Sequence, residues 1–347
     1  MAQAEALVTV RPEGLYCPAG DFYIDPWRPV ARAVITHAHA DHARRGHGAY
    51  LAQHASAPLL RARLGADLTL QTLAYGETVQ LGGVRLSLHP AGHVLGSAQV
   101  RLEHRGQVWV VSGDYKLDDD GLSTPFEPVR CHTFITESTF GLPIYRWPPA
   151  SEVLHQLLAW WHDNAAQGRT SVLYAYGLGK AQRVLAALQR QGAHGPGPLL
   201  VHEAVQPINA AYRAAGAPLS DVSSLGELTD RCLLRRALLV APPAAQGGAA
   251  LRRLGEPAVG QASGWMRVRG QRRRRGLEQG FVLSDHADWP ALLRAIAATG
   301  AERVLVTHGQ VAPLVRYLQE QGLDAHALAT EYGDEELVEH PVAESLA

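Results

Sequence analysis

One short segment, Thr36-His37-Ala38-His39-Ala40-Asp41-His42, constrains the fold of this chain more than any other. It places four side chains that can bind metal within six residues, directly after the apolar run Ala33-Val34-Ile35, which predicts a buried strand. Because a strand end fixes the backbone, the following turn can direct several imidazoles and a carboxylate at one point. Imidazole with carboxylate and without thiolate is more typical of catalytic than of structural zinc sites. The alternative is a solvated turn in a chain with 17 histidines, and the partner segments described below argue against it.

The composition limits what class of protein this is. Its 347 residues are enough for two domains, and 46% hydrophobic against 19% charged residues favour a sizeable core over long disorder. A net charge of −1 argues against a globally basic nucleic-acid-binding protein but not against a local basic groove. Cys17, Cys131 and Cys232 form no Cys-x-x-Cys pair, which fits a reducing compartment. With no apolar signal core and no run of roughly 20 apolar residues, we expect a cytoplasmic protein without a membrane partner.

The pattern along the chain has three parts. Up to about residue 146, short apolar runs alternate with glycine-rich turns, and hairpins are predicted at 76–88 and 98–111. After Ser151, predicted helices and strands alternate, which is typical of an α/β unit. Residues 261–280 are rich in glycine and arginine and are predicted to form a loop. The last part alternates again, beginning with a predicted strand at 281–284.

Four further segments repeat the pattern of a polar residue at the end of an apolar strand. They are the segments 88–93, 112–114, 283–286 and 306–309, which end at or next to His93, Asp114, His286 and His308. Sheets of α/β proteins place their functional sites at the carboxyl ends of strands. One such histidine could equally be a packing or capping residue. Five strand ends with the same pattern indicate one shared site.

These residues resemble the motifs of the metallo-β-lactamase superfamily. The segment 37–42 matches its motif of three histidines and an aspartate, and His93 and Asp114 match its third and fourth motifs. Glu137, His286 and His308 match the three additional motifs of the β-CASP branch, the nucleases of that superfamily. At finer detail, the chain is similar to bacterial DNA ligase-associated exonucleases in four segments, ITHAHADHARRGHGAYL, GLGKAQR, ASGWM and SDHADW.

The resemblance implies a fold and a domain order. The expected fold class is α/β, with a metallo-β-lactamase αββα sandwich formed from residues 1–147 and 276–347. A β-CASP domain, also α/β, is expected as an insertion at residues 148–275.

The resemblance also implies a site for two divalent metal ions, with zinc as the first choice and manganese as the alternative. The first ion is expected to bind His37, His39 and His93. The second is expected to bind Asp41, His42 and His308, with Asp114 bridging the two ions. Asp25 is expected to orient these ligands from behind, and Asp21 is the alternative for that role.

The same resemblance implies a mechanism. The expected catalytic residues are Asp41, Asp114, Glu137 and His286. A hydroxide held between the metal ions attacks a phosphodiester in line, and His286 serves as the acid or stabiliser at the leaving oxygen while Glu137 orients it. Without the resemblance, Glu137 is better interpreted as a cap at a strand end.

Two motifs and a basic run in the 148–275 region are candidates for nucleic-acid contacts. Lys180 closes a Gly-x-Gly-Lys segment at a helix start, which can cradle a phosphate but lacks the Walker spacing. Ser263 and Trp265 can offer a hydroxyl and a stacking ring, although Trp265 can equally be a core residue. The basic candidates for tracking phosphates, for which a solvated loop is the alternative, are Arg267, Arg269, Arg272, Arg273, Arg274 and Arg275.

The leading hypothesis is a metal-dependent DNA exonuclease, with 5′→3′ action on single strands favoured by kinship with cross-link-repair nucleases. The family analogy implies an ATP-dependent DNA ligase and a helicase as partners. The second hypothesis is RNA processing or degradation, because His308 is a feature of the RNA-directed β-CASP proteins. A small-molecule metallo-hydrolase ranks third, and an inactive binding module ranks last because no ligand is lost.

Overall fold

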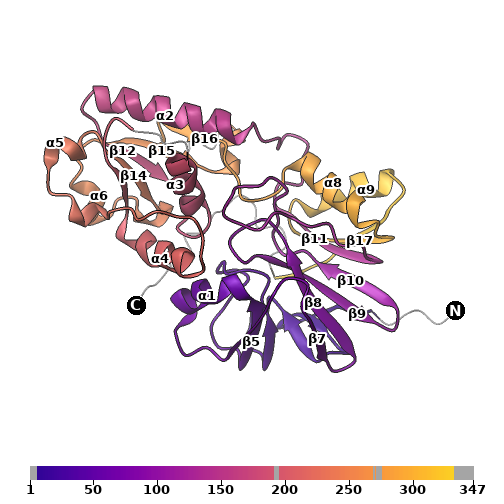
Figure 1. The fold of residues 1–347 in the computed structure, drawn as a ribbon. Helices are drawn as coiled ribbons and strands as arrows, with labels where there is room; N and C mark the ends of the chain where they lie inside the picture. Colours follow the sequence, from indigo (N-terminus) through magenta and orange to yellow (C-terminus); the bar gives the residue numbers. More distant parts are fainter. Residues whose placement is uncertain (1–5, 191–194, 269, 271–275, 332–347) are drawn as a thin grey trace. The chain divides into compact units, whose positions relative to one another are not determined.

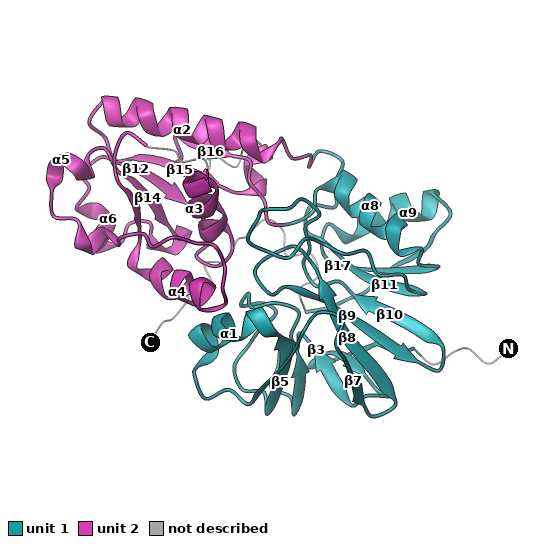
Figure 2. Ribbon diagram, viewed as in Figure 1, with its two compact units in different colours: residues 1–144, 286–340 teal, residues 145–285, 341–347 magenta. Residues whose placement is uncertain are grey.

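The computed structural model describes residues 6–190, 195–268, 270 and 276–331 (Figure 1). Of the described residues, those in 6–144 and 286–331 form one compact unit, called unit 1, and those in 145–285 form a second, called unit 2 (Figure 2). Both units contain helices and strands, so the chain is an α/β protein. No helix among the described residues is long and apolar enough to cross a bilayer.

Unit 1 contains two sheets within the described residues. The first has six strands in the order β1-β2-β3-β4-β5-β6 and the second has seven in the order β18-β17-β11-β10-β9-β8-β7. The strands of the first are β1 (Thr9–Arg11), β2 (Gly14–Cys17), β3 (Phe22–Ile24), β4 (Arg32–Val34), β5 (Ala49–Gln53) and β6 (Leu70–Leu73). Those of the second are β7 (Thr78–Leu81), β8 (Val84–Pro90), β9 (Ala98–His104), β10 (Gln107–Val111), β11 (Thr133–Ser138), β17 (Arg303–Gly309) and β18 (Asp324–Ala327).

The main core of unit 1 lies between these two sheets. Alternation along β8 directs Val84, Leu86 and Leu88 into it, all fully buried, where they meet Phe22 and Ile24 of the first sheet. The other face of the seven-stranded sheet is covered by α8 (Trp289–Thr299) and α9 (Val311–Glu320), which form a second apolar cluster with it (Figure 1). The predicted hairpins are found, and Gly82 provides the positive φ of +53° in the β7–β8 turn. The described part of unit 1 also contains η1 (His54–Ser56) and α1 (Ala57–Leu64).

Unit 2 is built on a parallel sheet of five strands in the order β13-β14-β12-β15-β16. Its strands are β12 (Ser171–Tyr174), β13 (Leu199–Val201), β14 (Leu238–Ala241), β15 (Ala258–Ala262) and β16 (Gln279–Phe281). Its described helices are α2 (Ala150–Ala166), α3 (Lys180–Arg190), η2 (Glu203–Val205), α4 (Gln206–Ala214), η3 (Leu225–Glu227), α5 (Arg231–Leu234), η4 (Pro243–Ala245), α6 (Ala249–Arg252) and η5 (Gly264–Arg267). The central strands are buried along their whole length, as is usual for a parallel sheet.

The structure differs from the sequence-based expectation at the end of unit 2. The segment 261–280 is not simply a loop, because it contains the end of β15, the short helix η5 and the start of β16. The strand expected at 281–284 lies at Gln279–Phe281 and pairs with β15 in unit 2. The second change of unit therefore falls at 285/286 rather than 275/276.

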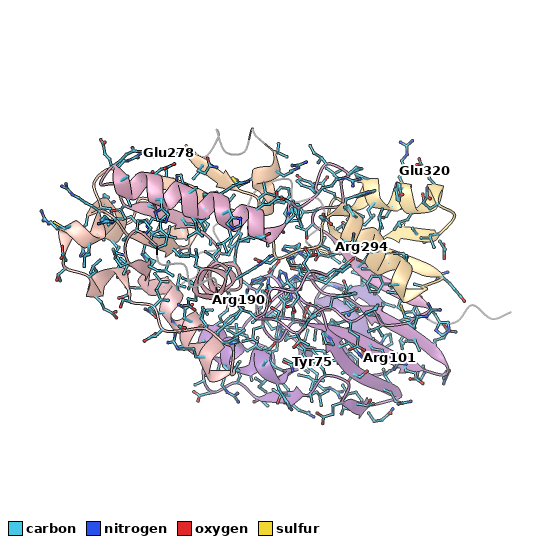
Figure 3. All side chains as sticks on the ribbon, turned by 45° about the horizontal axis from the view of Figure 1, so that its top comes forward. Tyr75, Arg101, Arg190, Glu278, Arg294 and Glu320 are labelled. Atoms are coloured by element: carbon cyan, nitrogen blue, oxygen red, sulfur yellow. The ribbon has the colours of Figure 1, made fainter. Side chains whose placement is uncertain are left out.

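Polar side chains lie on the outside of both units. Glu278 in unit 2 and Arg294 and Glu320 in unit 1 are exposed (Figure 3). Glu320 forms an ion pair with Arg316, one turn away on α9, at 2.9 Å. Such pairs on a helix surface each contribute only a few tenths of a kcal/mol, so the buried apolar clusters are the main source of stability.

Candidate metal centre

The histidine-rich segment begins where β4 ends. The backbone N–H of Ile35 donates to the Leu51 carbonyl at 2.8 Å, and the Thr36 carbonyl accepts from Ala98 at 2.8 Å, which fixes the exit from the strand. The chain then turns tightly, with the N–H of Ala43 donating to the carbonyl of His39 at 2.8 Å. The turn leaves His37 fully buried and His42 6% exposed. Strand and turn together therefore direct their side chains inward.

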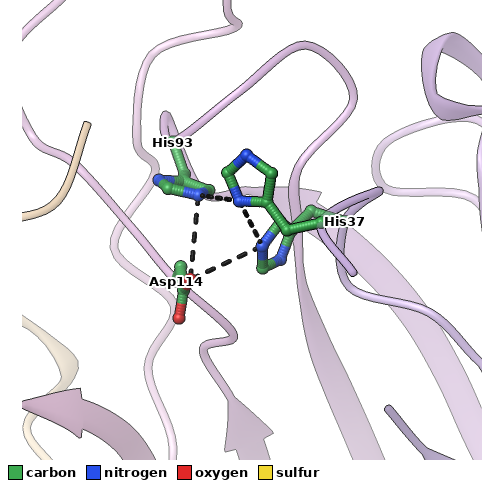
Figure 4. A group of neighbouring side chains, drawn as sticks. His37, His93 and Asp114 are labelled. Atoms are coloured by element: carbon green, nitrogen blue, oxygen red, sulfur yellow. Dashed lines mark hydrogen bonds and ion pairs between the residues drawn. The ribbon is translucent and has the colours of Figure 1, made fainter. Parts of the chain in front are cut away.

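Four side chains form the first group that could bind a metal ion, called the first metal-binding group below: His37, His39, His93 and Asp114. His39 Nδ1 lies 3.1 Å from His37 Nε2 and 3.0 Å from His93 Nε2, and Asp114 Oδ2 lies 3.5 Å from His37 Nε2 (Figure 4). One ligand atom from each of the four lies within 4.8 Å of all the others. Ring nitrogens and a carboxylate oxygen at this spacing are a donor set that suits zinc and related ions.

Asp41, His42 and His308 form a second group. Asp41 Oδ2 lies 3.6 Å from both His42 Nε2 and His308 Nε2, and the centres of the two rings are 5.2 Å apart. His308 comes from β17, more than 260 residues further along the chain than Asp41 (308 − 41 = 267).

Asp114 lies between the two groups. Its Oδ2 atom faces the first group, whereas Oδ1 lies 3.4 Å from His42 Nε2 of the second. Asp114 Oδ1 and His42 Nε2 are both buried, and neither has a hydrogen-bond partner of good geometry among the described residues. Buried polar atoms without such partners are uncommon, and a cation between these atoms would satisfy both. The residues present therefore fit a pair of divalent ions.

The pKa shifts agree with a cluster that binds positive charge. Burial opposes ionisation of Asp114, but His42 and His286 outweigh it and hold the pKa of that carboxyl well below its usual range. Burial, reinforced by His42, holds the pKa of His37 well below that of free histidine. His37 is therefore neutral, the form that a metal ligand requires.

Asp25 supports the second group from behind. Its carboxylate accepts hydrogen bonds from the Thr36 N–H at 2.7 Å and Thr36 Oγ1 at 2.5 Å, and lies 2.7 Å from His42 Nδ1. Because an ionised carboxylate can only accept, Nδ1 of His42 carries a proton and Nε2 is left to face Asp114. Asp21, the alternative, instead pairs with Arg32 and Tyr16 away from the cluster.

Glu137 and His286 form a third arrangement beside Asp114. His286 Nδ1 lies 3.0 Å and 3.1 Å from the two carboxylate oxygens of Glu137, and 4.0 Å from Asp114 Oδ2. Glu137 is 2% exposed, and its Oε1 also accepts from the Tyr115 N–H at 2.8 Å. The His286 side chain is 20% exposed, so it can meet a ligand while Glu137 fixes its ring.

A pocket of about 50 Å³ adjoins the centre on the side of the second group. Asp41, His42, Asp114, Glu137 and His308 line it, together with apolar residues from both sheets of unit 1. The volume is enough for one or two water molecules.

Comparison with known proteins gives relatives with nuclease and ligase names. No protein-family model matches the chain. The chain is 33% identical over 91% of its length to a probable DNA ligase of Opitutus terrae, of which it covers 30%. It is 28% identical over half its length to a ribonuclease of Thermus thermophilus, of which it covers 46%. Over 35% of its length it is 32% identical to an endoribonuclease of Yarrowia lipolytica, of which it covers 16%.

These three relatives are members of one family, whose motif residues converge in unit 1. The resemblance of this chain to the β-CASP branch of the metallo-β-lactamase superfamily, predicted from its motifs, is confirmed by these relatives. It spans less than half of the length of each of these curated relatives. A protein of unknown function from Enterococcus faecalis matches in structure, with a TM-score of 0.58 at 13% identity over 87% of this chain and 80% of that one, which is a likeness of fold.

The candidates for nucleic-acid contacts that the structure describes lie in unit 2. The Lys180 ammonium group is buried, 3.6 Å from Asp285 and 4.6 Å from the centre of the Tyr176 ring. Ser263 is buried and caps η5 by accepting from the Trp265 N–H at 3.3 Å. Trp265 is half-buried beside Tyr145, and Arg267 is exposed. Arg269 and Arg272 to Arg275 lie outside the described residues.

Sequence patterns alone missed several residues that hold the motif side chains in place. Thr36 links Asp25 to the turn, Tyr115 holds Glu137, and the Ser97 hydroxyl accepts from the N–H of His93 at 3.0 Å. Gly113 has a φ of +55°, and a Cβ at this position would lie only 2.7 Å from the Thr36 side chain. The sequence offered one signal for three of them: each is adjacent to a motif residue, Thr36 to His37, and Gly113 and Tyr115 to Asp114.

Proposed function

We propose that this chain is a metal-dependent nuclease that hydrolyses phosphodiester bonds at the centre in unit 1. The observation that carries the proposal is the position of Asp114, whose two oxygens face different histidine groups. Two metal ions held on either side of one carboxylate can lower the pKa of a water molecule to near neutrality and neutralise charge on a phosphoryl group. We further infer that unit 1 is the αββα metallo-β-lactamase domain and unit 2 the inserted β-CASP domain.

The protein's own side chains supply positioning and proton transfer. We assign the first ion to His37, His39 and His93, the second to Asp41, His42 and His308, and the bridge to Asp114. Glu137 holds Nδ1 of His286 and orients the ring, and we propose that this partly exposed imidazole hydrogen-bonds a substrate oxygen. His286 then gives a proton to the leaving alkoxide or stabilises its charge, and Glu137 stabilises the charged imidazole.

We favour DNA as the substrate, cut by an exonuclease working 5′→3′ on single strands in association with a DNA ligase. The Opitutus relative with a ligase name matches nearly the whole chain, whereas the two ribonucleases match half of it or less. RNA is the second candidate, supported by the names of those two relatives and by His308, which lies beside Asp41. Zinc is the proposed metal, with manganese as the alternative. A helicase is a further proposed partner, by family analogy.

The test is digestion of matched single-stranded DNA and RNA of one sequence, labelled at the 5′ or the 3′ end, with Zn²⁺ or Mn²⁺ added to chelator-treated protein. We expect metal-dependent release of short products from 5′-labelled DNA before the 3′ label is lost. Asp114→Asn is the control, because it removes the bridging charge at nearly constant size. Faster cleavage of RNA would replace the DNA assignment, and metal-independent cleavage or equal activity of the control would refute the proposed centre.

A further inference from the structure

The backbone that carries His308 is held in place by Ser138, at the end of β11. Ser138 is fully buried, and its hydroxyl donates to the His308 carbonyl, with the Thr307 carbonyl at 3.2 Å as a second acceptor. Its own carbonyl accepts from the N–H of Gln310 at 2.8 Å. Ser138 thus contacts the backbone before and at His308 in β17, and at Gln310, the first residue after this strand.

The need for this support comes from the register of the two strands. Thr136 pairs with Val306 and Ser138 pairs with Gly309, so two steps along β11 correspond to three along β17. The extra residue in β17 forms a bulge at Thr307–His308 and redirects the side chain there.

His308 has a φ of +59°, a conformation that residues other than glycine seldom adopt and that persists only when neighbours hold it. Gly309 follows at +79°, and a Cβ there would lie 2.5 Å from the Thr139 Cα. These two residues therefore pack closely against the end of β11, where the Ser138 hydroxyl donates hydrogen bonds to the backbone of β17.

The bulge determines the second metal-binding group and not the first. Of the groups described above, the one with Asp41 and His42 depends on where His308 points. The first group takes its histidines from the 37–39 turn and from His93, whose backbone is held by Ser97. Ser138 lies next to Glu137 in the chain, so the end of β11 serves both the proton-transfer pair and the second group.

We propose that Ser138 is a positioning residue that fixes His308 and thereby sets the affinity of the second metal position. The inference rests on the two-metal centre proposed above. It predicts that removing the hydroxyl lets the bulge relax, so His308 leaves Asp41 and His42 while the first position keeps its ligands.

The test uses the full chain and Mn²⁺ as the probe, with metal binding followed by calorimetry and by the paramagnetic resonance signal of a coupled manganese pair. We expect the parent protein to bind two ions, and Ser138→Ala to lose roughly 10- to 100-fold in affinity at one position, together with the coupled-pair signal. Ser138→Thr, which keeps the hydroxyl, should restore both. Thr139→Val is the matched control, because the adjacent Thr139 Oγ1 is buried without a hydrogen-bond partner among the described residues.

The outcomes separate this inference from the proposed function. A parent protein that binds fewer than two ions contradicts the two-metal centre itself. Two ions bound equally well by the parent and by Ser138→Ala refute the role of Ser138 alone, as does an equal loss in Thr139→Val. If Ser138→Ala does not fold, Ser138→Cys, which is closer to serine in size and a weaker donor, takes its place with the same two readings.

Discussion

At the scale of single residues, Asp114 and His286 have different proposed roles, metal binding for Asp114 and proton transfer for His286. Asp114 is buried between the two candidate metal-binding groups, so a change there would remove the side chain that both groups share. His286 lies 4.0 Å from Asp114 but belongs to neither group, because Nδ1 is engaged by Glu137. Metal binding and turnover are therefore separable by mutation.

Replacing His286 by Ala should leave the metal content unchanged and lower kcat by about 10²- to 10⁴-fold, because a positioned proton donor contributes that much. Glu137→Gln should lower kcat less, since the amide still contacts the ring without stabilising its charge. Combining the two changes should cost little more than His286→Ala alone, because the residues act as a unit. The measurements are kcat on an end-labelled oligonucleotide and metal content by mass spectrometry. Loss of metal from the His286 variant would contradict this separation.

The side chains that the structure brings together around Asp114 could be selected from the sequence because their chemical types are rare and their spacing repeats. The supporting residues could not. Ser138 and Thr36 are ordinary polar residues, and their roles come from contacts with backbone carbonyls or with Asp25 that no local pattern encodes. For the same reason, Asp21 remained an alternative to Asp25 as the carboxylate that orients the ligands. The hydrogen bonds that distinguish the two are made with residues distant in the sequence.

Helix α8 connects the site to the core at the scale of elements. Asp288, two residues after His286, caps it by accepting from the Ala291 N–H at 2.9 Å. The helix buries Leu292, Ala295 and Ile296 against the seven-stranded sheet. The cap therefore stabilises the segment that follows the proposed proton donor.

Replacing Asp288 by Ala should cost about 1 kcal/mol of stability, which corresponds to roughly 2–4 °C in Tm for a unit of this size. Thermal unfolding followed by circular dichroism measures the change. Asp67→Ala, at an exposed aspartate in the turn after α1, is the control and should shift Tm by less. Equal shifts in the two variants would show that the cap contributes nothing specific.

Elements with clear alternation or glycine turns could be predicted, whereas short strands with weak β propensity could not. The hairpins of β7 with β8 and of β9 with β10 follow their sequence pattern. Strand β15, Ala-Val-Gly-Gln-Ala, has one strong strand former, and its place comes from parallel pairing with β12 and β16. The Gly260 position is also crowded, because a Cβ there would lie 3.0 Å from the Phe281 ring.

At the scale of the whole molecule, unit 2 separates the two segments of the chain that form unit 1. The residues of both metal-binding groups, and the pair Glu137 and His286 beside them, belong to unit 1, but His286 and His308 follow unit 2 in the chain. Residues 6–144 alone therefore lack β17, His308 and the partner of Glu137. The alternation of strands and helices predicted a change of domain after about residue 146, whereas the return point depended on which sheet β16 joins.

The three cysteines report whether unit 1 packs as described, because both buried cysteines, Cys17 and Cys131, belong to it. Burial raises the pKa of Cys17 and of Cys131 to about 11, so both thiols stay protonated at pH 8, whereas Cys232 is exposed. A thiol reagent at pH 8 should therefore label one cysteine per native chain and three in denaturant, and none in native Cys232→Ser. Mass spectrometry of the labelled peptides gives the count. Rapid labelling of Cys17 would contradict the packing between the sheets of unit 1.

The central claim is that distant segments of unit 1 converge to hold two metal ions about Asp114. The most direct measurement is anomalous X-ray diffraction from crystals of the protein grown with Mn²⁺ or Zn²⁺. We expect two anomalous peaks, one within bonding distance of His37, His39 and His93 and one within bonding distance of Asp41, His42 and His308. A well-diffracting crystal with no peak at Asp114, or with peaks only elsewhere, would contradict the account.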